Sequence, residues 1–139
     1  MPIHPLAEIL TRHPSLTALG FEDDPQPIPE QAAARAKRLQ ELHSSADHWD
    51  AVCTWIRKHL PPTPRSRGYF SSYALKGMAE EELGPLPHGL FIAAMLHCDH
   101  RFLRQERHNP NAYFPLSKRR VVGLDRRAET RRRERADGR

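Results

Sequence analysis

Two helical patterns joined by a tight turn constrain the fold of this chain more than any other part of its sequence. Apolar residues recur at helical spacing over residues 72–83, and residues 88–98 are almost wholly apolar. Between them, Gly84 can adopt the left-handed conformation that ends a helix, and Pro85 stops any continuation. The spacing therefore predicts a helix, a short turn and a second helix.

Two short aromatic segments follow the second predicted helix. Residues 101–103 and 113–114 suit two strands, and Asn109-Pro110-Asn111 suits a turn between them. A helix, a turn, a helix and a small β-hairpin, in that order, predict a winged helix-turn-helix-like core over residues 69–117.

The rest of the chain predicts a mostly α-helical protein around this core. Residues 1–28 are rich in proline and are expected to form little more than one docked helical turn. Two helical patterns within residues 29–60, divided at Ser44-Ser45, predict an antiparallel helical hairpin. Residues 61–68, with Pro61 and Pro62 at their start, predict a stiff basic linker.

Positive charge is concentrated at the C-terminal end. Residues 118–139 contain 10 of the 22 Lys and Arg residues but only 4 of the 17 Asp and Glu residues. Charge of this density attracts polyanions or acidic protein surfaces, although a solvated tail that keeps the protein soluble is the alternative. Apolar residues occur only near the start of this segment, so we expect a basic C-terminal extension that docks once and then frays.

The second helix of the core is a poor candidate for reading DNA bases. Its sequence, GLFIAAMLHC, contains no Arg, Lys, Asn or Gln, which are the residues that form good bidentate contacts with bases. We therefore predict that this helix is buried and that any nucleic-acid contact is mainly to the backbone, without sequence specificity.

Basic and aromatic residues at the edges of the core are the better candidates. Such residues interleave before the first core helix, on the predicted wing and after it, a combination that suits backbone tracking and base stacking. The alternative is that the tyrosines pack in the core or at its rim. The predicted nucleic-acid-binding residues are Arg65, Arg67, Tyr69, Tyr73, Lys76, Asn111, Tyr113, Lys118, Arg119, Arg120, Arg126 and Arg127.

Catalytic, metal and membrane patterns are not found in the sequence. Glu80, Glu81 and Glu82 point in different directions on a helix, and the segment 97–100 (HCDH) lacks the paired spacing of a zinc site. We expect a protein that is not an enzyme and that needs no metal or cofactor. No apolar run approaches the roughly 20 residues of a membrane span, and no secretory signal is seen, so we expect a cytoplasmic protein with reduced cysteines.

Three segments resemble a known group of proteins. SSYALKGMAEEELG, GLFIAAML and PNAYFPLS are similar to a pattern in small, mostly uncharacterised bacterial proteins of plasmids, phages and integrated elements. The match covers residues 71–117 and departs at Ala74, at Gly77 and at residues 86–88. The resemblance implies a mobile-element setting and not a particular reaction.

Two functions suit a small protein in that setting. One is an accessory or regulatory protein that binds nucleic acid, with DNA as the first candidate. The other is an inhibitor of host defence, similar to an anti-CRISPR protein, that binds a bacterial nucleic-acid-binding effector. In the second case an acidic surface would mimic nucleic acid. The acidic residues available for this are Glu22, Asp23, Asp24, Glu80, Glu81 and Glu82.

Overall fold

The computed structural model describes residues 4–24, 28–63 and 68–138, and the protein is mostly helical, as expected. The helices are α1 (Pro5–Arg12), α2 (Pro29–Ser44), the 3-10 helix η1 (Ser45–His48), α3 (Trp49–His59), α4 (Ser72–Leu83), α5 (His88–His97) and α6 (Lys118–Asp137). The strands are β1 (Leu16–Thr17), β2 (Gly20–Phe21), β3 (Gly68–Ser71) and β4 (Tyr113–Leu116), which form two antiparallel pairs, β1–β2 and β3–β4. None of the described helices is long and apolar enough to cross a membrane.

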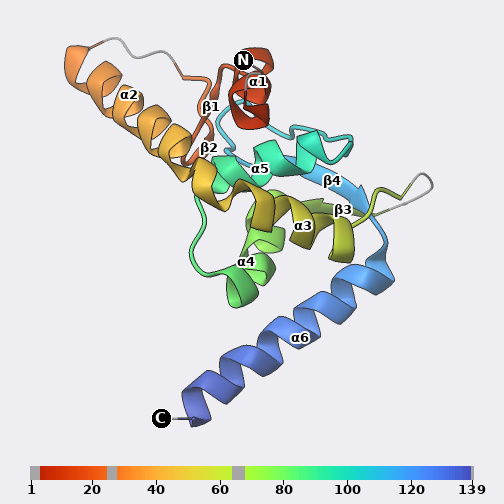
Figure 1. The fold of residues 1–139 in the computed structure, drawn as a ribbon. Helices are drawn as coiled ribbons and strands as arrows, with labels where there is room; N and C mark the ends of the chain where they lie inside the picture. The colour runs from red at the N-terminus through yellow and green to blue at the C-terminus, as the bar shows by residue number, and fades with distance from the viewer. Residues whose placement is uncertain (1–3, 25–27, 64–67, 139) are drawn as a thin grey trace.

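Helix α5 lies at the centre of the molecule, as Figure 1 shows. Its residues from His88 to Met95 are all buried, and α1, α3, α4 and the β1–β2 pair pack around it. At Gly89 the backbone of β1 comes so close that a Cβ atom would lie 1.9 Å from the carbonyl oxygen of Thr17. The prediction that this apolar helix is buried is confirmed.

The N-terminal segment contributes more to the core than its prolines predict. Leu6, Ile9 and Leu10 on α1 are buried, and so are Leu16 and Phe21 on the β1–β2 pair. The pair turns sharply at Gly20, which has a φ of +102° and lies directly against the backbone of Pro110. Strands of two residues have no periodicity, so the sequence pattern did not reveal this hairpin.

The predicted antiparallel pairing of the helices within residues 29–60 is wrong. Helix α2 packs against β1 and η1 but has no substantial contact with α3, and Figure 1 shows it extending away from the body of the protein. Leu42 is its one buried residue, because its other apolar positions are mostly alanines with little surface to bury. By contrast, α3 buries Trp49, Val52 and Ile56 against the core.

Strand β4 pairs with β3 and not, as predicted, with a full strand at residues 101–103. The β3–β4 register aligns Phe70 with Phe114 and Ser71 with Tyr113. On the other side of β4, the expected hairpin is reduced to a single bridge between Leu103 and Tyr113. Strand β3 begins at Gly68, which the sequence assigned to the linker.

Helix α6 is continuous over 20 residues, so the prediction that the C-terminal extension frays is wrong. Val121 and Ala128 are buried on it, and the helix packs against α4. Figure 1 shows it as a long helix along one side of the molecule. The apolar pattern was a poor guide because ion pairs supply most of the contact, as described next.

Candidate nucleic-acid interface

Two sets of cations on α6 differ in their partners, and the first set faces α4. Arg133 belongs to neither set, because it pairs with Glu129 on α6 itself. Arg127 and Arg131 both contact Glu82 Oε1, at 2.9 and 3.1 Å. Arg135 donates two hydrogen bonds to the carboxylate of Glu81, at 2.5 and 3.0 Å. The Glu82 carboxylate also accepts a hydrogen bond from the indole N–H of Trp55 on α3. These carboxylates therefore bind α6 to the body and neutralise part of its charge.

The second set consists of Lys118, Arg119, Arg120 and Arg126, which we call the outer cations. All four are exposed, and none forms an ion pair within the described part of the chain. Arg119 and Arg126 each come two residues before a buried residue of α6, which places them about 200° around the helix from the docked face. Their charge is thus available to an external anion.

The first turn of α6 is an unfavourable place for three cations. Ser117 caps the helix, because its Oγ accepts the N–H of Arg120 at 3.4 Å. Lys118, Arg119 and Arg120 follow at the positive end of the helix dipole, where cations are destabilising. Local conflicts of this kind are concentrated at functional sites, and a bound anion would relieve this one.

Lys76, which the sequence assigned to the interface, is engaged within the protein. Its ammonium group lies 2.9 Å from Glu80 Oε1 and 5.3 Å from the centre of the Tyr73 ring. The Lys76 side chain is only 12% exposed, whereas Tyr73 is 65% exposed. Of these two predicted residues, Tyr73 is accessible and Lys76 is largely neutralised.

Asn111 is also used internally. Its Oδ1 accepts the backbone N–H of Tyr73 at 3.0 Å, and its Nδ2 donates to Asn109 Oδ1 at 2.9 Å. At the same contact between the start of α4 and the loop before β4, which we call the α4 joint, Ser72 Oγ accepts the N–H of Ala112 at 3.1 Å. The segments SSY and PNA, which carry the sequence resemblance, therefore fasten the start of α4 to the loop before β4.

A buried histidine, His88, also bonds to Ser72 at the α4 joint. His88 Nδ1 lies 3.2 Å from the carbonyl oxygen of Leu19, so it carries the proton and donates, and Nε2 accepts from Ser72 Oγ at 2.6 Å. Burial, together with the nearby charge of Lys76, lowers the pKa of His88 to about 4. Both Ser72 and His88 are buried, so the pair joins three segments of the fold and presents no accessible nucleophile.

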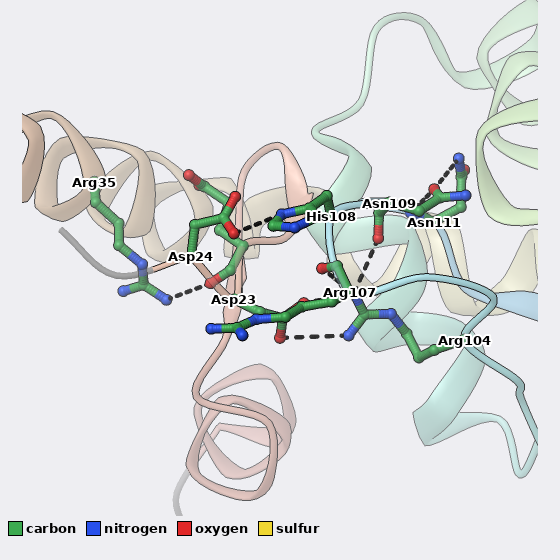
Figure 2. Close-up of polar contacts among 9 residues, drawn as sticks. Asp23, Asp24, Arg35, Arg104, Arg107, His108, Asn109 and Asn111 are labelled. Carbon is green, nitrogen blue, oxygen red and sulfur yellow. Dashed lines mark hydrogen bonds and ion pairs between the residues drawn. The ribbon is translucent and has the colours of Figure 1, made fainter.

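Arg104 organises the 104–111 loop, as Figure 2 shows, and was missed in the sequence. Its guanidinium contacts Asp23 at 2.6 Å, lies 4.1 Å from the centre of the Phe21 ring, and donates to the carbonyl oxygen of Asn109 at 2.9 Å. The Arg104 guanidinium lowers the pKa of the Asp23 carboxyl. Asp23 and Arg104 are 81 residues apart, so no local pattern links them.

Five of the six acidic residues suggested for nucleic-acid mimicry face internal Lys or Arg side chains, and Asp24 faces His108. The pairs are Glu22–Arg38, Asp23–Arg104, Asp24–His108, Glu80–Lys76, Glu81–Arg135 and Glu82–Arg127. Only the Asp24 pair is largely exposed, and its charge compensation depends on protonation of His108. The protein therefore has no continuous acidic surface built from these six residues.

The remaining predicted residues are placed as follows. Tyr69 and Tyr113 lie on β3 and β4, and Arg65 and Arg67 lie outside the described residues. No group of three or more His, Cys, Asp or Glu residues suited to a metal ion occurs in the described ranges. His100 from the HCDH segment instead bonds to the carbonyl oxygen of Leu60 at 2.8 Å.

Comparisons with known proteins do not assign the chain to a family. The chain matches no protein-family model, no curated protein and no solved structure.

Proposed function

We propose that this protein binds nucleic acid mainly through phosphate contacts, as an accessory or regulatory protein of a mobile genetic element. The observation that carries the proposal is the difference between two sets of α6 cations. The outer cations form no ion pair within the residues that the structure describes, whereas Arg127, Arg131 and Arg135 bind α4. Exposed, uncompensated cations along a helix suit a phosphate backbone and release counterions on binding. Such a protein would act in the bacterial cytoplasm.

The order of elements supports a winged helix-turn-helix-like core for this protein. Strand β3 precedes α4 and α5, and β4 follows them and lies between β3 and Leu103. Because α5 is enclosed on every side, it cannot enter a major groove as a recognition helix. Contact through the edges of this core, without base specificity, is the mode that remains.

The inhibitor alternative has less support. Mimicry of nucleic acid needs uncompensated carboxylates, and five of the six acidic residues considered for it have internal Lys or Arg partners. The sixth, Asp24, contacts His108. No other observation favours a defence effector as the partner.

A salt series tests the proposal. Fluorescence anisotropy of a labelled DNA duplex should show tight binding at low salt and a steep loss as salt rises. Replacing Arg119 and Arg126 by Gln should reduce the slope of log K against log salt by about 2 units, because about two phosphate contacts are lost.

The matched control replaces Lys37 and Arg57 by Gln, which changes the net charge equally on α2 and α3, away from α6. Both control residues are exposed, so folding should be unaffected. Equal slopes for the two double variants, or no binding of either duplex or single strand by the wild-type protein, would refute the proposal.

A further inference from the structure

The β3–β4 sheet has one face in the core and one face outward. Directly paired residues of an antiparallel sheet share a face. Phe70 pairs with Phe114, which is fully buried, so this pair marks the inner face. The opposite face is formed by the alternate residues, of which Pro115 is buried. We call the other four the outer sheet face: Tyr69, Ser71, Leu103 and Tyr113.

Large apolar side chains are exposed on the outer sheet face. Tyr69 is 49% exposed and Leu103 is 53% exposed, although both belong to residues that pair with β4. Tyr69 and Tyr113 are diagonal neighbours on adjacent strands, at a separation of roughly 7–8 Å. Asn109 Nδ2 donates a hydrogen bond to the Tyr113 hydroxyl at 3.0 Å, which holds that ring in place.

Cations outnumber carboxylates around the outer sheet face, although Asp99 lines the hollow beside Arg101 and Pro115. Arg101 is exposed and lies two residues before Leu103, and Lys118 and Arg119 follow directly after β4. Neither β3, β4 nor residues 101–103 contain a carboxylate. Because residues 101–103 run antiparallel to β4, Arg101 lies beside Pro115, at the same end of the face as Lys118. An aromatic surface with cations at one end is complementary to an anionic chain that presents unpaired bases.

We propose that the outer sheet face stacks unpaired bases, so that the preferred partner is single-stranded nucleic acid. This inference rests on the proposed function and adds to it. The outer cations bind the phosphates, while the rings of Tyr69 and Tyr113 stack on the bases. In a duplex those faces are hidden by neighbouring base pairs, so the rings gain nothing from double-stranded DNA.

Anisotropy with three labelled probes of equal length tests the inference: oligothymidylate, an abasic strand with the same phosphates, and a duplex. The wild-type protein should bind oligothymidylate at least about fivefold more tightly than the abasic strand. Tyr69→Thr should remove most of this advantage, and Tyr69→Phe should keep it, because the ring and not the hydroxyl is needed. Affinity for the duplex should be the same in all three proteins.

The outcomes separate the two proposals. Equal binding of oligothymidylate, abasic strand and duplex by the wild-type protein overturns the stacking inference and leaves the phosphate-binding proposal intact. A Tyr69→Thr protein that retains the full advantage, with an unchanged thermal midpoint, also overturns it. Binding of none of the probes overturns both. An oligouridylate probe then distinguishes RNA from DNA.

Discussion

At the scale of single residues, polar groups in the interior specify how the segments meet. Ser72, His88 and Asn111 come from three different segments, and their hydrogen bonds link these segments. Ser72 and His88 are themselves buried. An unsatisfied buried donor or acceptor costs about 1–3 kcal/mol, so these contacts select one arrangement over others of similar apolar burial.

His88 makes stability dependent on pH. Its pKa is about 4 in the folded protein and about 6.5 when exposed, so the unfolded chain binds more protons between these values. Stability should therefore fall as the pH drops from about 6.5 toward 4, by up to roughly 3 kcal/mol from this group. Urea unfolding at pH 7 and pH 5 measures the effect.

The variant His88→Asn provides the comparison. Burial also lowers the pKa of His59 and His100, so some loss of stability at low pH should persist in the variant. The difference between pH 7 and pH 5 should nevertheless shrink by about 2 kcal/mol. A difference as large as in the wild-type protein would show that His88 is not the group responsible.

Two glycines in helices should respond oppositely to alanine. At Gly77 on α4, a Cβ atom would meet nothing within 4 Å, so Gly77→Ala should stabilise the protein by about 0.5–1 kcal/mol. At Gly89 the same change places a Cβ 1.9 Å from the carbonyl oxygen of Thr17, which requires the backbone to move. Thermal midpoints should rise for Gly77→Ala and fall sharply for Gly89→Ala; a shift in the same direction for both would contradict the packing at α5.

At the scale of elements, α6 depends on charge more than on apolar burial. Val121 and Ala128 supply little buried area, whereas Glu81 and Glu82 hold the C-terminal half of the helix. A helix attached in this way should open more readily than α5, which is buried throughout.

Glu82→Gln tests this attachment. The amide keeps the size of the side chain but loses the charge that Arg127 and Arg131 contact. Because both guanidinium groups are about half exposed and screened by solvent, we expect a loss of about 1 kcal/mol, seen as roughly fivefold faster hydrogen exchange over residues 124–137. Glu129→Gln, which breaks an exposed pair within α6, is the control and should change exchange by less than twofold. Unchanged exchange in Glu82→Gln would mean that the ion pairs do not hold α6.

Short sequence patterns predicted those features of the fold that neighbouring residues determine. The stop at Gly84 marked the end of α4 correctly, because it acts within a few residues. The β3–β4 pairing joins residues more than 40 positions apart, and no short pattern indicates it. The candidate site was hard to predict for the same reason. The sequence shows that Arg127 is a cation, but it does not show that Arg127 forms an ion pair with Glu82.

At the scale of the whole molecule, the fold as well as the sequence determines which charges are paired and which remain exposed. The sequence places 22 basic residues against 17 acidic ones, with the excess near the C-terminus. Folding pairs Glu22, Asp23, Glu81 and Glu82 with cations from distant parts of the chain. Of the cations that remain exposed on α6, Arg119 and Arg126 lie on the side opposite the docked face, two turns apart. Such a row suits an extended polyanion better than a small ligand.

The enclosure of α5 also has a consequence for biosynthesis. During translation, residues 4–24 leave the ribosome well before residues 88–97, against which they pack. Leu6, Leu16 and Phe21 therefore stay without their native partners until most of the chain has been made. We expect the nascent chain to gain protection from proteases late and in one step, once α5 has emerged and the N-terminal segment can close over it.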